Sequence, residues 1–131
     1  MNDRFEVILD PDAAKEYQKL DDSVISIVDK TLDRLQKRAD EIGKPLRNQN
    51  NSRLAGCKEI KLRDIGIRIV FRIANQFVHV LRVVYILSIE QRSDDLVFKL
   101  ASKRLGELSQ NPSAVITAGK KYKDMKADSK E

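Results

Sequence analysis

The stretch EIKLRDIGIRIVFRI, residues 59–73, decides the fold of this chain. Side chains along a β-strand alternate between two faces, so the apolar residues on either side of Gly66 gather on one face. The opposite face receives a basic residue at nearly every second position, and these residues are Lys61, Arg63, Arg68 and Arg72. The pattern predicts a β-hairpin with one face in the core and a small cationic surface on the other.

Working outward, hydrophobic periodicity and turn residues predict the other elements. Asp10 followed by Pro11 is a typical helix start, and apolar residues recur at helical spacing after it. The residues expected to face inward from the second helix are Val24, Ile27, Val28, Thr31, Leu32 and Leu35. The predicted order is a strand at 4–10, helices at 11–20 and 21–42, strands at about 54–63, 66–74 and 77–87 joined by the turns RDIG and ANQ, and a helix at 93–108.

This order predicts an α+β fold. The N-terminal strand and a helical hairpin pack on a twisted, mostly antiparallel four-stranded sheet, and the C-terminal helix closes the structure. Residues 1–108 are expected to form the domain. Residues 109–131 lose the periodicity and end in a lysine-rich run, so they are predicted to be a flexible tail. A short strand or helix at SAVITAG, residues 113–119, is the alternative.

The composition favours an anionic partner and argues against several kinds of site. The 131 residues contain 25 Lys and Arg against 20 Asp and Glu, a formal charge of +5. Cys57 and His79 are the only residues of their kinds, so neither an intramolecular disulfide nor a zinc site is expected. No metal or cofactor is predicted. No apolar run is long enough to span a membrane, so we expect a cytoplasmic protein without a membrane partner.

Three segments, in the order in which they occur, resemble one family. They are AAKEYQKLDDSV (13–24), LAGCKEIKLRDIGIRIVFRI (54–73) and EQRSDDLVFKLASKRL (90–105). The chain resembles the RelE/ParE superfamily of toxins from bacterial type II toxin–antitoxin modules over about residues 5–106. The resemblance implies a fold similar to microbial ribonucleases. Members of the RelE branch are metal-independent endoribonucleases that cut mRNA in the ribosomal A site, whereas members of the ParE branch poison DNA gyrase.

Carried over position by position, the resemblance implies a set of site residues. Lys61 matches a catalytic lysine, Arg68 the arginine after the turn glycine, and Arg92 the arginine before the last helix. Arg63 matches a basic neighbour of the catalytic lysine. The residues expected to bind RNA are Lys58, Arg63 and Arg72.

Two positions depart from the RelE pattern. Glu59 stands where a lysine is usual, and Phe98 stands where several members have a tyrosine that helps deprotonate the attacking hydroxyl. The remaining aromatic candidates for stacking an RNA base are Tyr17 and Tyr85, although their patterning favours the core. The departures leave open a second interpretation, in which the chain is a weakened enzyme that acts mainly as a binding module.

Cationic residues suit this chemistry, because RNA cleavage by its own 2′-hydroxyl needs charge stabilisation at phosphorus. Arg68 and Arg92 can hold phosphate oxygens in two-point contact. Lys61, crowded by like charges, is a candidate general base, and Glu59 is either a base itself or a disrupting residue. The favoured hypothesis is an RelE-like mRNA interferase that arrests translation and growth. Its implied partners are a cognate antitoxin, mRNA and the ribosome, and operator DNA through the antitoxin.

Overall fold

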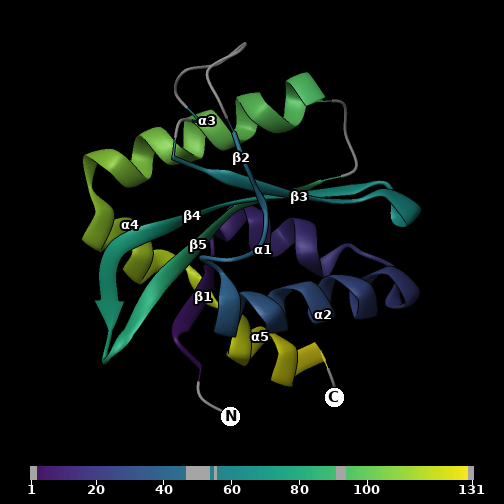
Figure 1. The fold of residues 1–131 in the computed structure, drawn as a ribbon, viewed down its shortest axis with the longest axis horizontal. Coiled ribbons are helices and arrows are strands. Elements are labelled where there is room, and N and C mark those ends of the chain that lie inside the picture. The colour runs from purple at the N-terminus through teal and green to yellow at the C-terminus, as the bar shows by residue number, and fades with distance from the viewer. Residues whose placement is uncertain (1–2, 47–53, 55, 91–93, 130–131) are drawn as a thin grey trace.

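The computed structural model describes residues 3–46, 54, 56–90 and 94–129 (Figure 1). Figure 1 shows the sheet nearly edge-on, with α3 on one side and α2 and α5 on the other. The strands are β1 Phe5–Leu9, β2 Lys44–Pro45, β3 Lys58–Leu62, β4 Ile67–Val78, β5 Leu81–Glu90 and β6 Lys120–Lys121. The α-helices are α1 Pro11–Gln18, α2 Asp22–Arg38, α3 Asp94–Gln110, α4 Pro112–Ala118 and α5 Tyr122–Ser129, and a 3-10 turn, η2, covers Arg63–Ile65.

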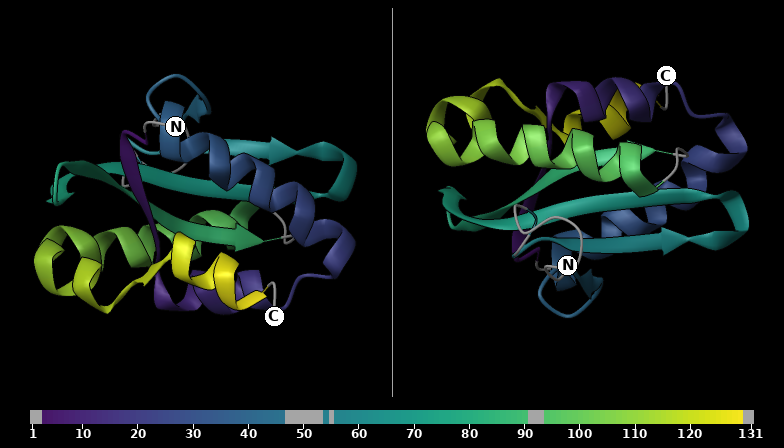
Figure 2. Two further views of the ribbon diagram at one scale, coloured as in Figure 1. Left: turned by 90° about the horizontal axis from the view of Figure 1, so that it is seen from below. Right: turned by 90° about the horizontal axis from the view of Figure 1, so that it is seen from above.

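The described strands form one mixed sheet of six in the order β2-β3-β4-β5-β1-β6. β1 pairs parallel with β5, and the other pairs are antiparallel. Four strands carry most of the sheet, because β2 and β6 each have two residues. The β4–β5 hairpin runs across most of the width of the molecule (Figure 2). The predicted α+β architecture is therefore confirmed, with two short edge strands that the sequence pattern did not indicate.

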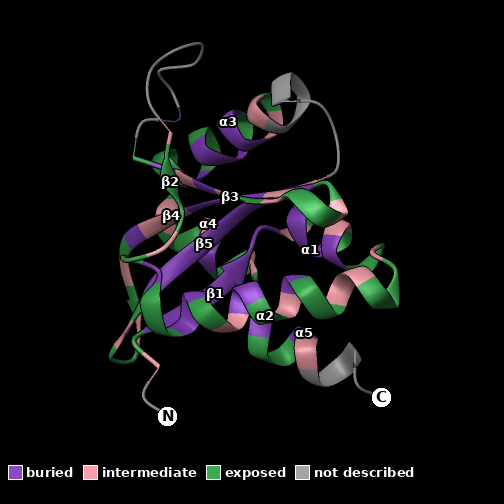
Figure 3. Ribbon diagram, turned by 45° about the vertical axis from the view of Figure 1, so that its right-hand side comes forward, coloured by how far each residue is buried: buried purple, intermediate pink, exposed green. Residues whose placement is uncertain are grey.

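The sheet has a hydrophobic core on each face. One core joins the apolar face of β4, including Ile69 and Phe71, to α1, α2 and α5. The second core lies on the face expected to be a cationic surface, where Val70 and Tyr85 pack with Ala101 of α3. Because both faces are covered, β1 and β5 are buried along most of their length (Figure 3). Of the cationic residues predicted on this face, Lys61 and Arg63 are exposed and Arg68 is half-buried.

The predicted turn of the second hairpin and the predicted inward position of Ile27 are both wrong. The turn of the second hairpin was expected at 74–76, but β4 continues to Val78 and the turn lies at His79, which has a φ of 57°. A register shift between Ile73 and Phe77 lets the strand pass through this polar stretch, since a bulge absorbs extra residues without ending the strand. Ile27 is 37% exposed and does not share the buried stripe of α2.

Residues 112–129 are not the predicted flexible tail. The alternative at 113–119 is confirmed, since α4 covers most of that segment. β6 then pairs with β1, and α5 packs against β1, so Tyr122 is 1% exposed. Its hydroxyl donates to the backbone oxygen of Asp29 at 3.1 Å and to Asp33 at 3.0 Å. The segment is rich in lysine, but it also contains Tyr122 and Met125, which belong to the core formed with α1 and α2.

Candidate nucleic-acid interface

A row of charged residues crosses three neighbouring strands. Lys61 of β3 lies opposite Arg68 of β4, and Arg68 lies opposite Glu90 of β5. Residues opposite each other on one face have Cβ atoms about 4.5–5.5 Å apart. A hollow of about 380 Å³ adjoins the row, and the residues that line it are Lys61, Leu62, Arg63, Gly66, Ile67 and Arg68. The structure therefore brings three of the predicted cationic residues together around one hollow.

Two side chains, those of Glu59 and Phe98, interact with Arg68. Its Nε lies 3.2 Å from Oε1 of Glu59, and the two side chains are 16% and 7% exposed. The guanidinium carbon lies 5.6 Å from the centre of the Phe98 ring, within cation–π range. Oε1 of Glu59 has no hydrogen-bond partner among the described residues, so the attraction is that of an ion pair. Glu59 thus compensates the charge of Arg68.

We expected Arg63 and Arg68 to crowd Lys61 with like charge, but the charge of Arg68 is compensated. Lys61 is exposed, and the cation opposite it is ion-paired with Glu59. Arg63 is exposed in η2 beside the same hollow. The left-handed conformation that ends η2 falls on Gly66, with a φ of 68°, which favours glycine. This turn fixes where Arg63 and Arg68 lie relative to each other.

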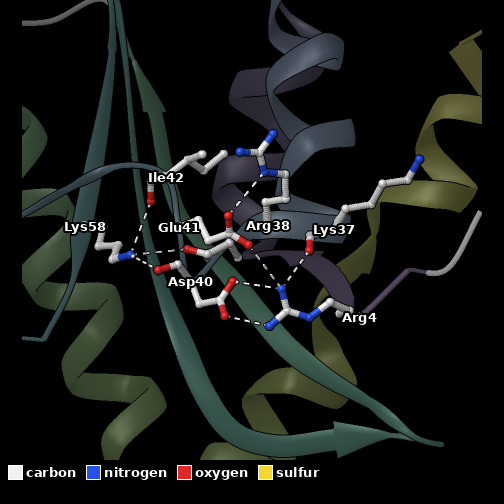
Figure 4. A network of polar contacts seen from close by, with 8 residues as sticks. Arg4, Lys37, Arg38, Asp40, Glu41, Ile42 and Lys58 are labelled. Carbon is white, nitrogen blue, oxygen red and sulfur yellow. Dashed lines mark hydrogen bonds and ion pairs between the residues drawn. The ribbon is translucent and has the colours of Figure 1, made fainter.

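Lys58, predicted to bind RNA, lies on the other face of the sheet. Alternation along β3 groups it with Ile60, and its Nζ donates to the backbone oxygens of Ala39, Asp40 and Ile42 at 3.2–3.3 Å (Figure 4). The ammonium there satisfies carbonyls just past the end of α2. Figure 4 also shows the Arg4 guanidinium on Asp40, at 2.6 and 3.1 Å, which lowers the pKa of Asp40. Lys58 is a structural residue of this network.

Arg72 is not among the residues that line the hollow. Its guanidinium lies against Gly56, where an added Cβ would meet Nη1 at 2.7 Å, and its charge acts on the neighbouring Cys57. Burial raises the pKa of that thiol to about 11, so Cys57 is not a ready nucleophile. Arg92, the third predicted catalytic residue, lies outside the described residues.

Sequence reasoning missed a group of polar residues behind the row. Arg104 of α3 is 6% exposed and donates to both carboxylate oxygens of Glu16, at 3.2 and 2.8 Å, and to the backbone oxygen of Leu87 at 2.8 Å. Glu16 also accepts from the backbone amide of Ile89 at 2.9 Å, at a part of β5 that β1 does not pair. Burial raises the pKa of Glu16, and the neighbouring Glu90 adds to this effect. The sequence signal for Glu90 is the alternation of polar and apolar residues in SIE, residues 88–90, at the end of β5.

The two candidate stacking tyrosines belong to the core, as their patterning favoured. Tyr85 is fully buried and donates to Asp10 at 3.1 Å, while Tyr17 donates to Asp29 at 2.6 Å. Burial and the neighbouring Asp10 carboxylate raise the pKa of Tyr85 far above its ordinary value. Among the described residues, therefore, these two phenols do not replace the tyrosine of the RelE pattern.

The described part of the chain holds no group of three or more His, Cys, Asp and Glu residues suited to a metal ion. Within the same residues, no helix has the length and apolar character to cross a bilayer.

Solved structures that are similar to this chain include those of E. coli toxin RelE. No model of a protein family matches the chain, and neither does any curated protein. A double arginine-to-alanine mutant of E. coli toxin RelE in the free state is 27% identical, with a TM-score of 0.61 over 79% of this chain and 98% of RelE. The isolated E. coli RelE toxin is 28% identical, with a TM-score of 0.53 over 77% and 98% of the two chains. A chain of the intact E. coli RelBE toxin–antitoxin complex is 25% identical, with a TM-score of 0.50 over 68% and 98%. The chain is therefore RelE-like, with the α+β fold of that toxin along most of its length.

Proposed function

We propose that the chain is the toxin of a type II toxin–antitoxin module and cleaves mRNA on the ribosome, in the cytoplasm. The observation that carries the proposal is the hollow lined by Lys61, Arg63 and Arg68 on a RelE-like fold. Three cations from a strand, a turn and the next strand can contact successive phosphates without any base-specific contact. If the ribosome positions the mRNA, these phosphate contacts supply most of the affinity for RNA that the enzyme needs.

In this proposal Arg68 stabilises the charge that develops on the phosphate as the 2′-oxygen attacks. Its guanidinium is preorganised by Glu59 and Phe98, and a group held in place before the reaction stabilises a transition state most effectively. Lys61 and Arg63 are exposed and hold the flanking phosphates. Arg92 would add a fourth cation from the segment between β5 and α3.

The test is induction of the chain in a bacterial host, followed by mapping of RNA 5′ ends. We expect growth arrest with cuts at defined codon positions, and a strong reduction of both in Lys61→Ala. Lys30→Ala, an exposed lysine of α2, is the matched control and should stay fully toxic. Growth arrest with intact mRNA and trapped gyrase–DNA complexes would replace the proposal by a ParE-like activity.

A second candidate function is a binding module that cuts RNA weakly and acts mainly with its antitoxin. The Glu59–Arg68 ion pair favours it, because the carboxylate competes with phosphate for the guanidinium. Phe98 also lacks the hydroxyl found in the RelE pattern. Changing Glu59→Lys and Phe98→Tyr together discriminates the two: a large gain of toxicity over a weak wild type supports the module, and strong toxicity of the wild type excludes it.

We also propose a cognate antitoxin as the partner, with operator DNA bound through it. The E. coli RelBE complex, in which RelE is held by its antitoxin, supports this partner by likeness. The net charge of +5 suits an acidic segment, and electrostatic steering would make the association fast. Co-expression with the product of the neighbouring gene should yield a stable complex and restore growth. Recovery of the chain alone from cells that carry the native locus would contradict the partner.

A further inference from the structure

Glu59 is a buried acidic residue that contacts one of the cations of the hollow. It lies inside the sheet, because β3 is paired on both sides, with Lys44 of β2 opposite Glu59 on one side and Val70 of β4 on the other. Its side chain is 7% exposed, and its Oε1 atom has no hydrogen-bond partner among the described residues. A carboxylate in such a place is costly unless a positive charge lies close to it. The Nε atom of Arg68, 3.2 Å from Oε1, supplies that charge.

The ion pair lowers the positive charge that an RNA phosphate meets in the hollow. Lys61, Arg63 and Arg68 line the hollow, whereas Glu59 is not among its lining residues. The carboxylate lies within contact distance of Arg68, so it cancels most of the attraction that this guanidinium exerts on a nearby phosphate. A phosphate in the hollow is therefore attracted mainly by Lys61 and Arg63.

Free RNA and mRNA held by the ribosome depend differently on this charge. A protein that binds a free single strand obtains much of its affinity from charged contacts with phosphates. An mRNA that the ribosome positions relies less on the affinity of the hollow, and its cleavage depends on a group held in place at the reacting phosphate. Arg68 is held in this way by the ion pair with Glu59 and by the ring of Phe98. The carboxylate therefore lowers the affinity for free RNA and keeps Arg68 in position for mRNA on the ribosome.

We propose that Glu59 is a specificity-determining residue, which restricts cleavage to mRNA on the ribosome by weakening the binding of free RNA. Glu59 acts through Arg68 and touches no reacting atom, so it is a positioning residue and not a catalytic one. This role rests on the proposed function, because it names which RNA the same hollow accepts. Arg68 is kept when the charge of Glu59 is removed, so the other contacts of Arg68 do not decide the test.

The test is binding of a fluorescently labelled, unstructured RNA oligonucleotide to the purified chain, measured by anisotropy over a series of salt concentrations. Glu59→Gln removes the charge and keeps the size of the side chain. Each phosphate contact of a single strand adds about 0.7 to the slope of log affinity against log salt concentration. Glu59→Gln should therefore steepen this slope by about 0.7, which gives about fivefold tighter binding than the wild type at about 0.1 M salt.

Two further variants control for net charge and for folding. Glu107→Gln removes the charge of an exposed glutamate of α3 that does not line the hollow, and it should keep the wild-type slope and affinity. Glu59→Gln with Arg68→Ala removes both charges of the ion pair, so it should bind the oligonucleotide about as tightly as the wild type. If Arg68 attracted phosphate at full strength, this double variant would bind about fivefold more weakly, and the role of Glu59 would be wrong even if Glu59→Gln alone failed to fold.

Cleavage measures the change of specificity. The wild type should cut mRNA on bacterial ribosomes and leave the same mRNA intact when it is free, whereas Glu59→Gln should also cut the free mRNA. Equal binding of the oligonucleotide by Glu59→Gln and the wild type would overturn the role of Glu59 and leave the nuclease in place. Tighter binding by Glu59→Gln, with no cleavage by the wild type on ribosomes, would instead overturn the proposed function and support the effect of Glu59 on RNA affinity.

Discussion

Replacing Arg68 by alanine should destabilise the folded chain as well as slow RNA cleavage. The side chains of Glu59 and Arg68 are 7% and 16% exposed and 3.2 Å apart, so removing the guanidinium leaves a buried carboxylate without its counter-charge. Breaking a buried pair in this way costs about 3–5 kcal/mol. Because Arg68 keeps some contact with water, we expect the lower end of this range, about 3 kcal/mol. A solvated residue would change the free energy of unfolding by about 0.5 kcal/mol or less.

Urea denaturation, monitored by circular dichroism, measures the free energy of unfolding directly. Glu59→Gln with Arg68→Ala removes both charges, so the double variant should regain most of the lost stability. Arg34→Ala, an exposed arginine of α2, is the control and should change stability by about 0.5 kcal/mol or less. A loss below about 1 kcal/mol in Arg68→Ala would refute the reasoning, because it would mean that water already screens the pair. Because the double variant should fold, it separates the effect of Arg68 on cleavage from its effect on stability. We expect it to cleave RNA about 100- to 1,000-fold more slowly than wild type.

Three further predictions follow from the packing. Tyr122→Ala should reduce the free energy of unfolding by about 3–5 kcal/mol in urea denaturation, because the ring is 1% exposed in the main core; a loss under about 0.5 kcal/mol would mean that residues 112–129 are a tail after all. Gly56→Ala should be more destabilising than Gly66→Ala in the same assay, because the φ of 89° at Gly56 lies farther from the left-handed region near 57° than the φ of 68° at Gly66, and a Cβ at Gly56 would also have to displace the end of the Arg72 side chain; equal losses would contradict this. Glu16 has a pKa raised above 4.5 in the folded chain, so its stabilisation is present at acid pH and is lost as the pH rises through the folded pKa; Glu16→Gln should therefore gain stability relative to wild type from pH 4 to pH 7, and a difference that is constant with pH would contradict the shift.

Alternation was enough to predict the central hairpin, because only one register puts the apolar residues of both its strands on the same face. The same rule places Lys58 with Ile60 and away from Lys61, so its assignment to the RNA site could have been avoided. The Glu59–Arg68 pair was not predictable in the same way. The two residues share a face, but their contact depends on the register that sets Glu59 opposite Val70 and Lys61 opposite Arg68.

Other features depend on tertiary contacts that leave little trace in sequence. Residues 74–76 have turn composition, yet a bulge carries β4 through them to Val78. The segment from Lys120 is dominated by lysine, and two apolar residues suffice to dock α5. The Glu16–Arg104 contact joins residues 88 positions apart, and no spacing rule indicates such a pair.

We propose that RNA is cut at the hollow of Lys61, Arg63 and Arg68. The most direct measurement is cleavage of an mRNA on purified bacterial ribosomes by the wild-type chain and by Lys61→Ala, with Lys30→Ala as control. We expect cuts in the A-site codon with 2′,3′-cyclic phosphate ends, which persist in Lys30→Ala and fall strongly in Lys61→Ala. Equal cleavage by Lys61→Ala and wild type would contradict this site, since the reaction would then take place away from the hollow.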